Sequence, residues 1–175
     1  ALGKPFLILL NSAHPQGEAA QKLRAKLAEQ YDVTCLAVSC LELDQQAVTE
    51  IIQAVLYEFP LEELQLFLPD WVETLPTEHP IRTALFQAIR AQAGKLVRIR
   101  DVKPAVAAMG QCELVTGAAV TGMKLGSGCC QARLELPRSL FYDTLSQQTG
   151  FALHSDGELL ALLERLAVVQ AEHQK

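Results

Sequence analysis

An apolar run near the amino end, residues 6–10, constrains the fold of this 175-residue chain more than any other stretch. Pro5 precedes the run, and a polar turn that begins at Asn11 follows it. Five consecutive apolar residues between such boundaries are typical of a strand that is buried on both faces, as in parallel sheets. A central strand at this position needs neighbouring strands, and too few follow it. The run therefore predicts that the chain begins inside a domain of a longer protein.

The composition is that of a globular protein, with 50% hydrophobic and 20% charged residues. The net charge is −5 with acidic and basic residues interleaved, which argues against binding of nucleic acid through its phosphate backbone. Membrane insertion is not expected, because the apolar runs are shorter than the ~20 residues that a membrane helix needs. The five cysteines are odd in number and lack C-x-x-C spacing. This pattern predicts reduced thiols in a reducing cytoplasm rather than disulfides or a zinc site.

The first part of the chain alternates strand and helix patterns, which predicts a partial parallel sheet of the α/β class. The expected elements are a strand at 5–10, a helix at 17–31, a strand at 33–38 and a helix at 45–58. Asp44 is the expected N-cap of the second helix, and Pro60 ends it. That helix has the clearest 3.6-residue periodicity in the chain.

Beyond Pro60 the pattern changes to that of a smaller α+β unit with an antiparallel sheet. We place the boundary within residues 60–76, which gives one unit at 1–76 and a second at 77–175. The second unit is expected to begin with a long helix that Thr77 caps and that has an apolar stripe reaching Ile99. Strands at 111–120 and 129–136 and a helix from Pro137 to Gly150 should follow. A strand at 151–154 and a last helix, which begins at the capping box Ser155–Glu158, complete the unit. The last helix is apolar over a wide arc, so it either buries two sides or meets sequence beyond Lys175.

Two turns follow the predicted parallel strands at their carboxyl ends, where open α/β sheets bind ligands. The first holds Asn11 and Ser12, and the second holds Ser39 and Cys40. An asparagine in such a turn can lie beside a nucleotide base, or it can simply hydrogen-bond its own turn. The residues alone leave both interpretations open.

Two further clusters have ordinary structural explanations. Gly122, Gly126 and Gly128 do not form a phosphate-binding G-x-x-x-x-G-K-S/T motif, because Lys124 is misplaced and a strand follows, so a β-turn or bulge is expected. The basic residues Lys95, Arg98 and Arg100 are expected to lie at a helix end, where cations are favoured.

Several stretches, taken in order, resemble one protein family. They are residues 3–6 running into Asn11, Ser12 and Pro15; residues 26–38; residues 50–72 with the strings Leu56-Tyr57-Glu58-Phe59-Pro60 and Leu68-Pro69-Asp70-Trp71-Val72; residues 98–102; residues 122–128; and Pro137. The chain resembles the stage IV sporulation protein A family, the spore-coat morphogenetic ATPases of endospore-forming bacteria. The similarity extends over nearly the whole chain.

The resemblance implies that residues 1–76 are the C-terminal part and linker of a P-loop ATPase domain, and that residues 77–175 are the family's middle domain. The phosphate-binding loop and magnesium ligands would then lie before Ala1. Residues 11–14 occupy the place where related GTPases carry N-K-x-D. His14 stands at its fourth position, so the carboxylate that would accept guanine's N–H groups is missing, which agrees with the family's use of ATP. Asn11, Ser12, Ser39 and Cys40 are the residues implied to lie on the base side of the nucleotide.

The resemblance further implies that ATP hydrolysis drives the full-length protein to polymerise into the basement layer of the spore coat, on the mother-cell side of the forespore's outer membrane. ATP and magnesium would be the cofactors of that protein, and coat and membrane-anchoring proteins its partners. This stretch alone is expected to be structural, with no bound cofactor and no ATPase activity. A P-loop hydrolase or switch with an effector domain, and a pure adaptor for coat proteins, remain alternatives. A partial sheet would also leave apolar surface bare and favour self-association.

Overall fold

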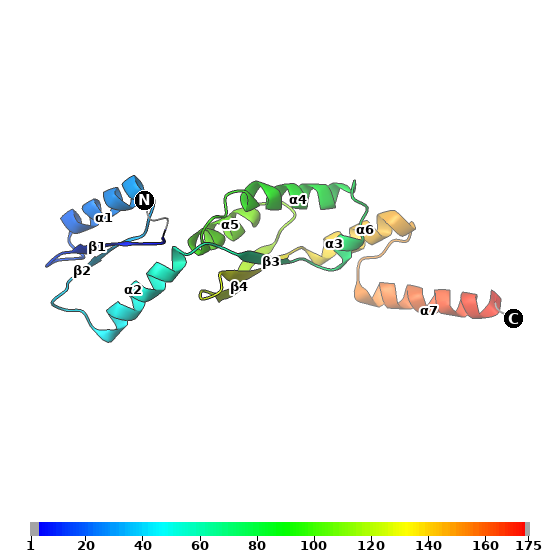
Figure 1. The fold of residues 1–175 in the computed structure, drawn as a ribbon. Coiled ribbons are helices and arrows are strands. Elements are labelled where there is room, and N and C mark those ends of the chain that lie inside the picture. The colour runs from blue at the N-terminus through cyan, green and yellow to red at the C-terminus, as the bar shows by residue number, and fades with distance from the viewer. Residues whose placement is uncertain (1–3, 174–175) are drawn as a thin grey trace.

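The computed structural model describes residues 4–173 and has an elongated shape with three successive parts (Figure 1). Its elements in chain order are β1 (Ile8–Asn11), α1 (Glu18–Tyr31), β2 (Cys35–Val38), α2 (Gln45–Tyr57), β3 (Glu63–Phe67), α3 (Trp71–Thr74), α4 (Pro80–Ala93), the 3₁₀ turn η1 (Ile99–Asp101), α5 (Val102–Met109), β4 (Gly117–Lys124), β5 (Cys129–Glu135), α6 (Arg138–Thr149) and α7 (Asp156–His173). We call β1 to α2 the N-terminal unit and β3 to β5, with their helices, the middle unit.

The N-terminal unit is a two-stranded parallel sheet, as the strand–helix–strand order predicts. β1 and β2 pair in register from Ile8 opposite Cys35 to Asn11 opposite Val38, and α1 packs against both strands. The Asp44 side chain caps α2 by accepting a hydrogen bond from the Ala47 N–H group. Within this chain, however, β1 is not enclosed on both faces, because Phe6 is 54% and Leu9 47% exposed. The N-terminal unit thus has the partial parallel sheet that was predicted, with one face left open.

The middle unit contains a mixed three-stranded sheet in the order β3–β5–β4. β4 runs antiparallel to β5, as expected, and carries a bulge between Val120 and Gly122. β3 runs parallel to β5, and the sequence patterns did not predict this pairing. The α/β class is confirmed, with a parallel pair in the N-terminal unit and, in the middle unit, a mixed sheet that contains one antiparallel pair.

Four expectations about the middle unit were wrong in detail. The long helix begins at Pro80 with the His79 side chain, not Thr77, as its cap, and it ends at Ala93. Ile99 belongs to η1, which leads into the unpredicted helix α5. The expected strand at 111–120 begins only at Gly117, and residues 151–154 form no strand.

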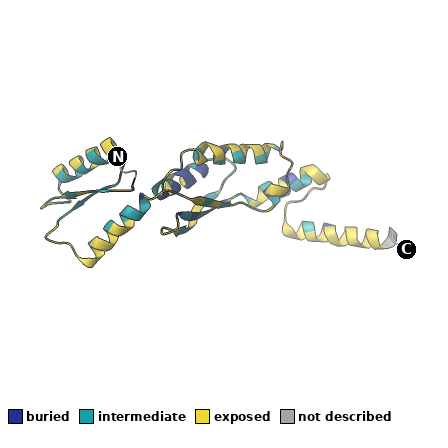
Figure 2. Ribbon diagram, in the orientation of Figure 1, coloured by how far each residue is buried: buried dark blue, intermediate teal, exposed yellow. Residues whose placement is uncertain are grey.

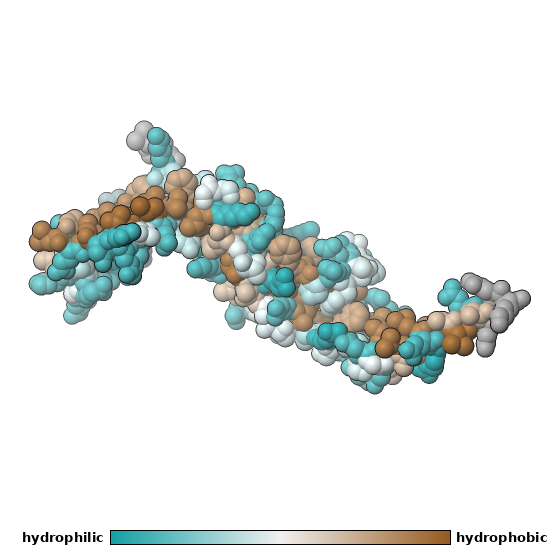
Figure 3. All heavy atoms as spheres, turned by 90° about the horizontal axis from the view of Figure 1, so that it is seen from below, coloured by the Kyte–Doolittle hydropathy of each residue, from teal (hydrophilic) through white to brown (hydrophobic). Residues whose placement is uncertain are grey.

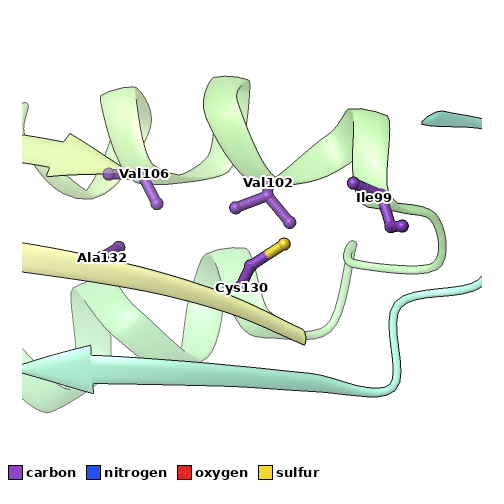
Figure 4. Packing of buried hydrophobic residues seen from close by; sticks show 5 residues of the cluster. All are labelled: Ile99, Val102, Val106, Cys130 and Ala132. Carbon is purple, nitrogen blue, oxygen red and sulfur yellow. The ribbon is translucent and has the colours of Figure 1, made fainter. Parts of the chain in front are cut away.

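The core lies between the sheet of the middle unit and its helices (Figure 2). Figure 4 shows Val102 and Val106 of α5, with Ile99 beside them, pointing toward Cys130 and Ala132 of β5. A second cluster joins Leu85 of α4 and Met109 of α5 to Leu134 of β5 and to Val72 of α3. The strand predicted at 129–136 has the alternation of a half-solvated strand, since Cys130, Ala132 and Leu134 are buried while Arg133 and Glu135 are exposed.

The two last helices form a small cluster of their own around Tyr142, Leu153 and Leu162. α6 ends at Thr149, and Gly150, the predicted end of this helix, caps it in the left-handed conformation that glycine favours. Ser155 caps α7, but the Glu158 carboxylate accepts from the His154 N–H group rather than from that of Ser155. Within the described part of the chain α7 buries little of its apolar arc: Leu160, Leu163, Leu166, Val168 and Val169 are exposed. Figure 3 shows apolar residues gathered over both α7 and the N-terminal unit.

Candidate functional site

The structure brings all four predicted base-side residues to one edge of the N-terminal sheet. Asn11 ends β1 opposite Val38, the last residue of β2, so the two turns leave the sheet side by side. The Ser12 N–H group donates to the Val38 carbonyl at 2.9 Å, and the Cys40 N–H group donates to Asn11 Oδ1 at 3.1 Å. The Asn11 side chain thus joins the two turns rather than closing its own.

The surroundings of this edge leave it accessible. Cys40 and His14 are exposed, and no hydrogen bond among the described residues uses the Asn11 Nδ2 group. The His14 N–H group donates to Ser12 Oγ at 3.2 Å, which shapes the first turn, and the His14 carbonyl accepts from Gly17. The edge therefore offers an amide, two hydroxyls and backbone groups, but no carboxylate at position 14. Such a set can hydrogen-bond a neutral heterocycle, but it lacks the carboxylate that could accept two guanine N–H groups at once.

Gly126 and Gly128 lie in the turn that closes the β4–β5 hairpin, whereas Gly122 lies in β4 beside its bulge, so the segment contains the predicted turn and bulge. Gly128 adopts a φ of +68°, and its carbonyl accepts from the N–H groups of Glu62 and Glu63 at 3.0 and 3.3 Å. A Cβ atom at Gly128 would lie 2.8 Å from the Pro60 carbonyl oxygen. The close approach of two backbones explains this glycine, because only glycine fits a left-handed position against another chain segment.

Sequence reasoning missed a cluster of charged residues where the N-terminal and middle units meet. Its centre is Glu58, which follows α2 and is 3% exposed. The Glu58 carboxylate accepts from the Thr34 N–H group and from the Nη1 atoms of Arg98 and Arg100, at 2.8, 3.2 and 3.1 Å. The prediction that Arg98 and Arg100 decorate a helix end is therefore wrong, because both arginines bind a buried carboxylate.

Asp32 completes this cluster from the turn between α1 and β2. It adopts a left-handed φ of +49°, which turns its carbonyl oxygen toward both arginines. The Arg100 Nη2 atom also lies 2.8 Å from Asp32 Oδ1. We call Asp32, Thr34, Glu58, Arg98 and Arg100 the Glu58 cluster; it contains two carboxylates and two guanidinium groups, so its formal charge is zero. A sequence signal did exist, since Glu58 follows a strongly apolar helix and needs a cationic partner if it is buried.

A shallow groove of about 460 Å³ lies elsewhere, at the carboxyl ends of β3 and β5. Phe67, Asp70, Thr116 and Arg133 are among the residues that line it. None of the predicted site residues borders it.

The described residues contain no group of three or more histidine, cysteine, aspartate or glutamate side chains arranged to hold a metal ion. No helix in the described part of the chain is both long and apolar enough to cross a bilayer.

Comparison with known families matches the two units, each of which has its own sheet, to two different domain models. A model of the stage IV sporulation protein A ATPase domain matches residues 1–60, and a model of that family's middle domain matches residues 61–175. The chain belongs to the stage IV sporulation protein A family. The Glu58 cluster therefore draws three of its members from the ATPase-domain match and two, Arg98 and Arg100, from the middle-domain match.

Curated relatives carry the same assignment. The chain is 33% identical to "Stage IV sporulation protein A" of Clostridioides difficile and 29% identical to the proteins of that name from Bacillus subtilis and Bacillus anthracis. Each match covers 99% of this chain but only 35% of the relative, so the chain spans about a third of the length of these relatives. A search of the solved structures found no significant match.

Proposed function

We propose that this chain is the part of a sporulation ATPase that holds the base side of the nucleotide and joins the ATPase domain to the middle domain. The observation that supports the base-side assignment is the bond from the Cys40 N–H group to Asn11 Oδ1, which ties together the two turns at the carboxyl edge of the parallel strands. The four contact residues of the proposal are Asn11, Ser12, Ser39 and Cys40. ATP with magnesium is the proposed nucleotide of the full-length protein, and its phosphate-binding residues would come from outside this chain.

The proposed choice of adenine over guanine depends on position 14. A carboxylate there would accept hydrogen bonds from two guanine N–H groups, whereas His14 in its neutral form offers at most one acceptor. An unpaired buried donor costs about 1–3 kcal/mol, so a missing acceptor lowers the affinity for guanine selectively.

The test is the substitution His14→Asp in the full-length protein. We expect the ratio of kcat/KM for GTP to that for ATP to rise at least tenfold, or about 1.4 kcal/mol. His154→Asp adds the same charge at an exposed site in the loop before α7 and serves as the matched control. An unchanged GTP-to-ATP ratio in His14→Asp, with hydrolysis of ATP intact, would contradict the base-side assignment.

The proposed role of the hydrolysis is polymerisation of the full-length protein into the basement layer of the spore coat, at the outer surface of the forespore membrane in the mother-cell cytoplasm. The exposed apolar residues of the N-terminal unit and α7 support self-association and contacts with coat and membrane-anchoring proteins. ATP-dependent filaments of the full-length protein would separate this proposal from a simple hydrolase or switch.

We also propose a boundary between the two domains within residues 60–76, and the pairing of β3 with β5 supports its placement before β3. The 175-residue chain alone is proposed to have no ATPase activity.

A further inference from the structure

The strongest link between the N-terminal and middle units is the Glu58 cluster. Three of its residues, Asp32, Thr34 and Glu58, lie in the N-terminal unit or at its end, and Arg98 and Arg100 flank η1 in the middle unit. Two backbone bonds cross beside it: the Leu61 N–H group donates to the Val97 carbonyl, and the Ile99 N–H group donates to the Phe59 carbonyl, both at 3.0 Å. Side chains and main chain therefore close the same junction.

The burial of Glu58 makes this junction different from a flexible linker. A solvated linker needs few contacts across it, whereas a carboxylate that is 3% exposed is tolerated only while its partners stay in place. Both arginines are partly buried, with side chains 29% and 25% exposed. Relative motion of the two units would withdraw the guanidinium groups and leave the Glu58 carboxylate without a cationic partner, with only the Thr34 N–H group and hydroxyl still donating to it.

The cluster is also connected to the base-side edge. Thr34 directly precedes β2, and both its N–H group and its hydroxyl donate to Glu58 Oε1. The carbonyl of Thr34 accepts from the Ile8 N–H group at the start of β1. At about 3.3 Å per residue, the extended segment from Thr34 to Cys40 spans about 20 Å. A paired strand therefore joins the Glu58 carboxylate to the turn that holds Ser39 and Cys40.

We propose that Glu58 is a clamp that fixes the N-terminal and middle units as one rigid body, and that it thereby positions the Ser39–Cys40 turn relative to the three-stranded sheet. The clamp itself follows from the geometry of the junction. Its consequence for nucleotide response rests on the proposed function: a change at the base-side turns would reach the middle unit through β2, Thr34 and Glu58.

Residual dipolar couplings of backbone amides test the clamp in the 175-residue chain. We expect the couplings of residues 8–57 and of residues 63–135 to fit one alignment tensor in the unaltered chain. In Glu58→Gln they should need two different tensors, while amide shifts far from the junction stay unchanged. Arg100→Lys keeps the charge but removes the fork that reaches both Glu58 and Asp32, so it should loosen the junction with less risk to folding.

Glu50→Gln is the matched control, because Glu50 is an exposed glutamate of α2 that binds only Gln46 within the described residues. It should leave a single tensor. Two tensors in the unaltered chain, or one tensor in both Glu58→Gln and Arg100→Lys, would overturn the clamp.

A second experiment separates the clamp from the proposed function. In the full-length protein, Glu58→Gln should retain ATP hydrolysis within about threefold but reduce ATP-dependent assembly, measured by sedimentation, by at least tenfold. Normal assembly of this variant would overturn the clamp's role in nucleotide response. Absence of ATP-dependent assembly in the unaltered full-length protein would instead contradict the proposed function, and the dipolar couplings would still decide whether the clamp exists.

Discussion

The contribution of the Glu58 cluster to the free energy of unfolding can be predicted from its contacts. The substitution Glu58→Gln keeps the shape of the side chain and one oxygen that can still accept from Thr34. It replaces the other oxygen, which accepts from the Arg98 Nη1 atom at 3.2 Å, with an amide donor. Two donors then face each other, and the negative charge that both arginines bind is lost.

Removing one partner of a fully buried ion pair costs about 3–5 kcal/mol, whereas exposed pairs contribute about 0–1 kcal/mol. Glu58 is buried, but its arginines are partly exposed and keep Asp32 as a partner, so water and Asp32 offset part of the loss. We therefore expect the free energy of unfolding to fall by about 2–3 kcal/mol, a value between these two ranges. With a urea m-value of about 2 kcal/mol/M, the midpoint should fall by about 1–1.5 M.

The assay is urea unfolding followed by circular dichroism, which reports on both units, and by fluorescence of Trp71, the only tryptophan, which lies in α3. Coincident transitions would justify a two-state free energy. A double-mutant cycle of Glu58→Gln with Arg100→Gln should give a coupling energy of about 1–2 kcal/mol. A loss below about 0.5 kcal/mol would place the pair in the range of solvated surface pairs and refute our reasoning about burial.

Two further predictions concern backbone conformation and thiol chemistry. Gly128→Ala should destabilise the chain by at least about 1–2 kcal/mol, since a left-handed residue with a Cβ is strained, and the new atom would meet the Pro60 carbonyl at 2.8 Å. Gly126→Ala is the control in the same urea assay, because a Cβ at Gly126 would meet open space. Equal losses of stability in both variants would contradict the close approach at Gly128. Burial raises the pKa of the Cys35 and Cys130 thiols, so deprotonation favours the unfolded state, and the free energy of unfolding should fall as the pH rises above the ordinary thiol pKa of about 8.5. The double variant Cys35→Val/Cys130→Val should lose that part of the pH dependence, and an unchanged profile between about pH 8 and 9.5 would count against the buried thiols.

Local patterns were sufficient to predict much of the fold. The parallel pair β1–β2, the Asp44 cap, the alternation in β5 and the left-handed Gly150 all follow from periodicity or from the conformational preference of single residues. Asn11, Ser12, Ser39 and Cys40 lie at one edge of the N-terminal sheet, because the carboxyl ends of neighbouring parallel strands share one edge. Whether they contact a nucleotide stays a prediction.

The features that sequence reasoning missed depend on contacts between distant segments. β3 becomes a strand by pairing with β5, whose residues lie 66 positions later, such as Gln131 opposite Gln65. The helix expected to continue toward Ile99 stops at Ala93, since the next residues are needed to pair with Phe59 and Leu61. Arg98 and Arg100 were assigned to a helix end because nothing within a few residues of them identifies their partner. Local propensity does not report such long-range pairing.

The short strings that carry the family resemblance bear on the clamp. The resemblance rests in part on residues 31–33, 56–60 and 98–102, and these three strings contain Asp32, Glu58, Arg98 and Arg100. Each string places a charge beside apolar residues, and the structure joins the three strings into one neutral cluster. A buried Glu58 carboxylate alone would be costly, and Arg98 and Arg100 repel each other, so the contacts between the strings stabilise all of these charges at the junction. The cluster thus requires the ATPase-domain and middle-domain segments together, which is the physical reason to expect them to move as one body.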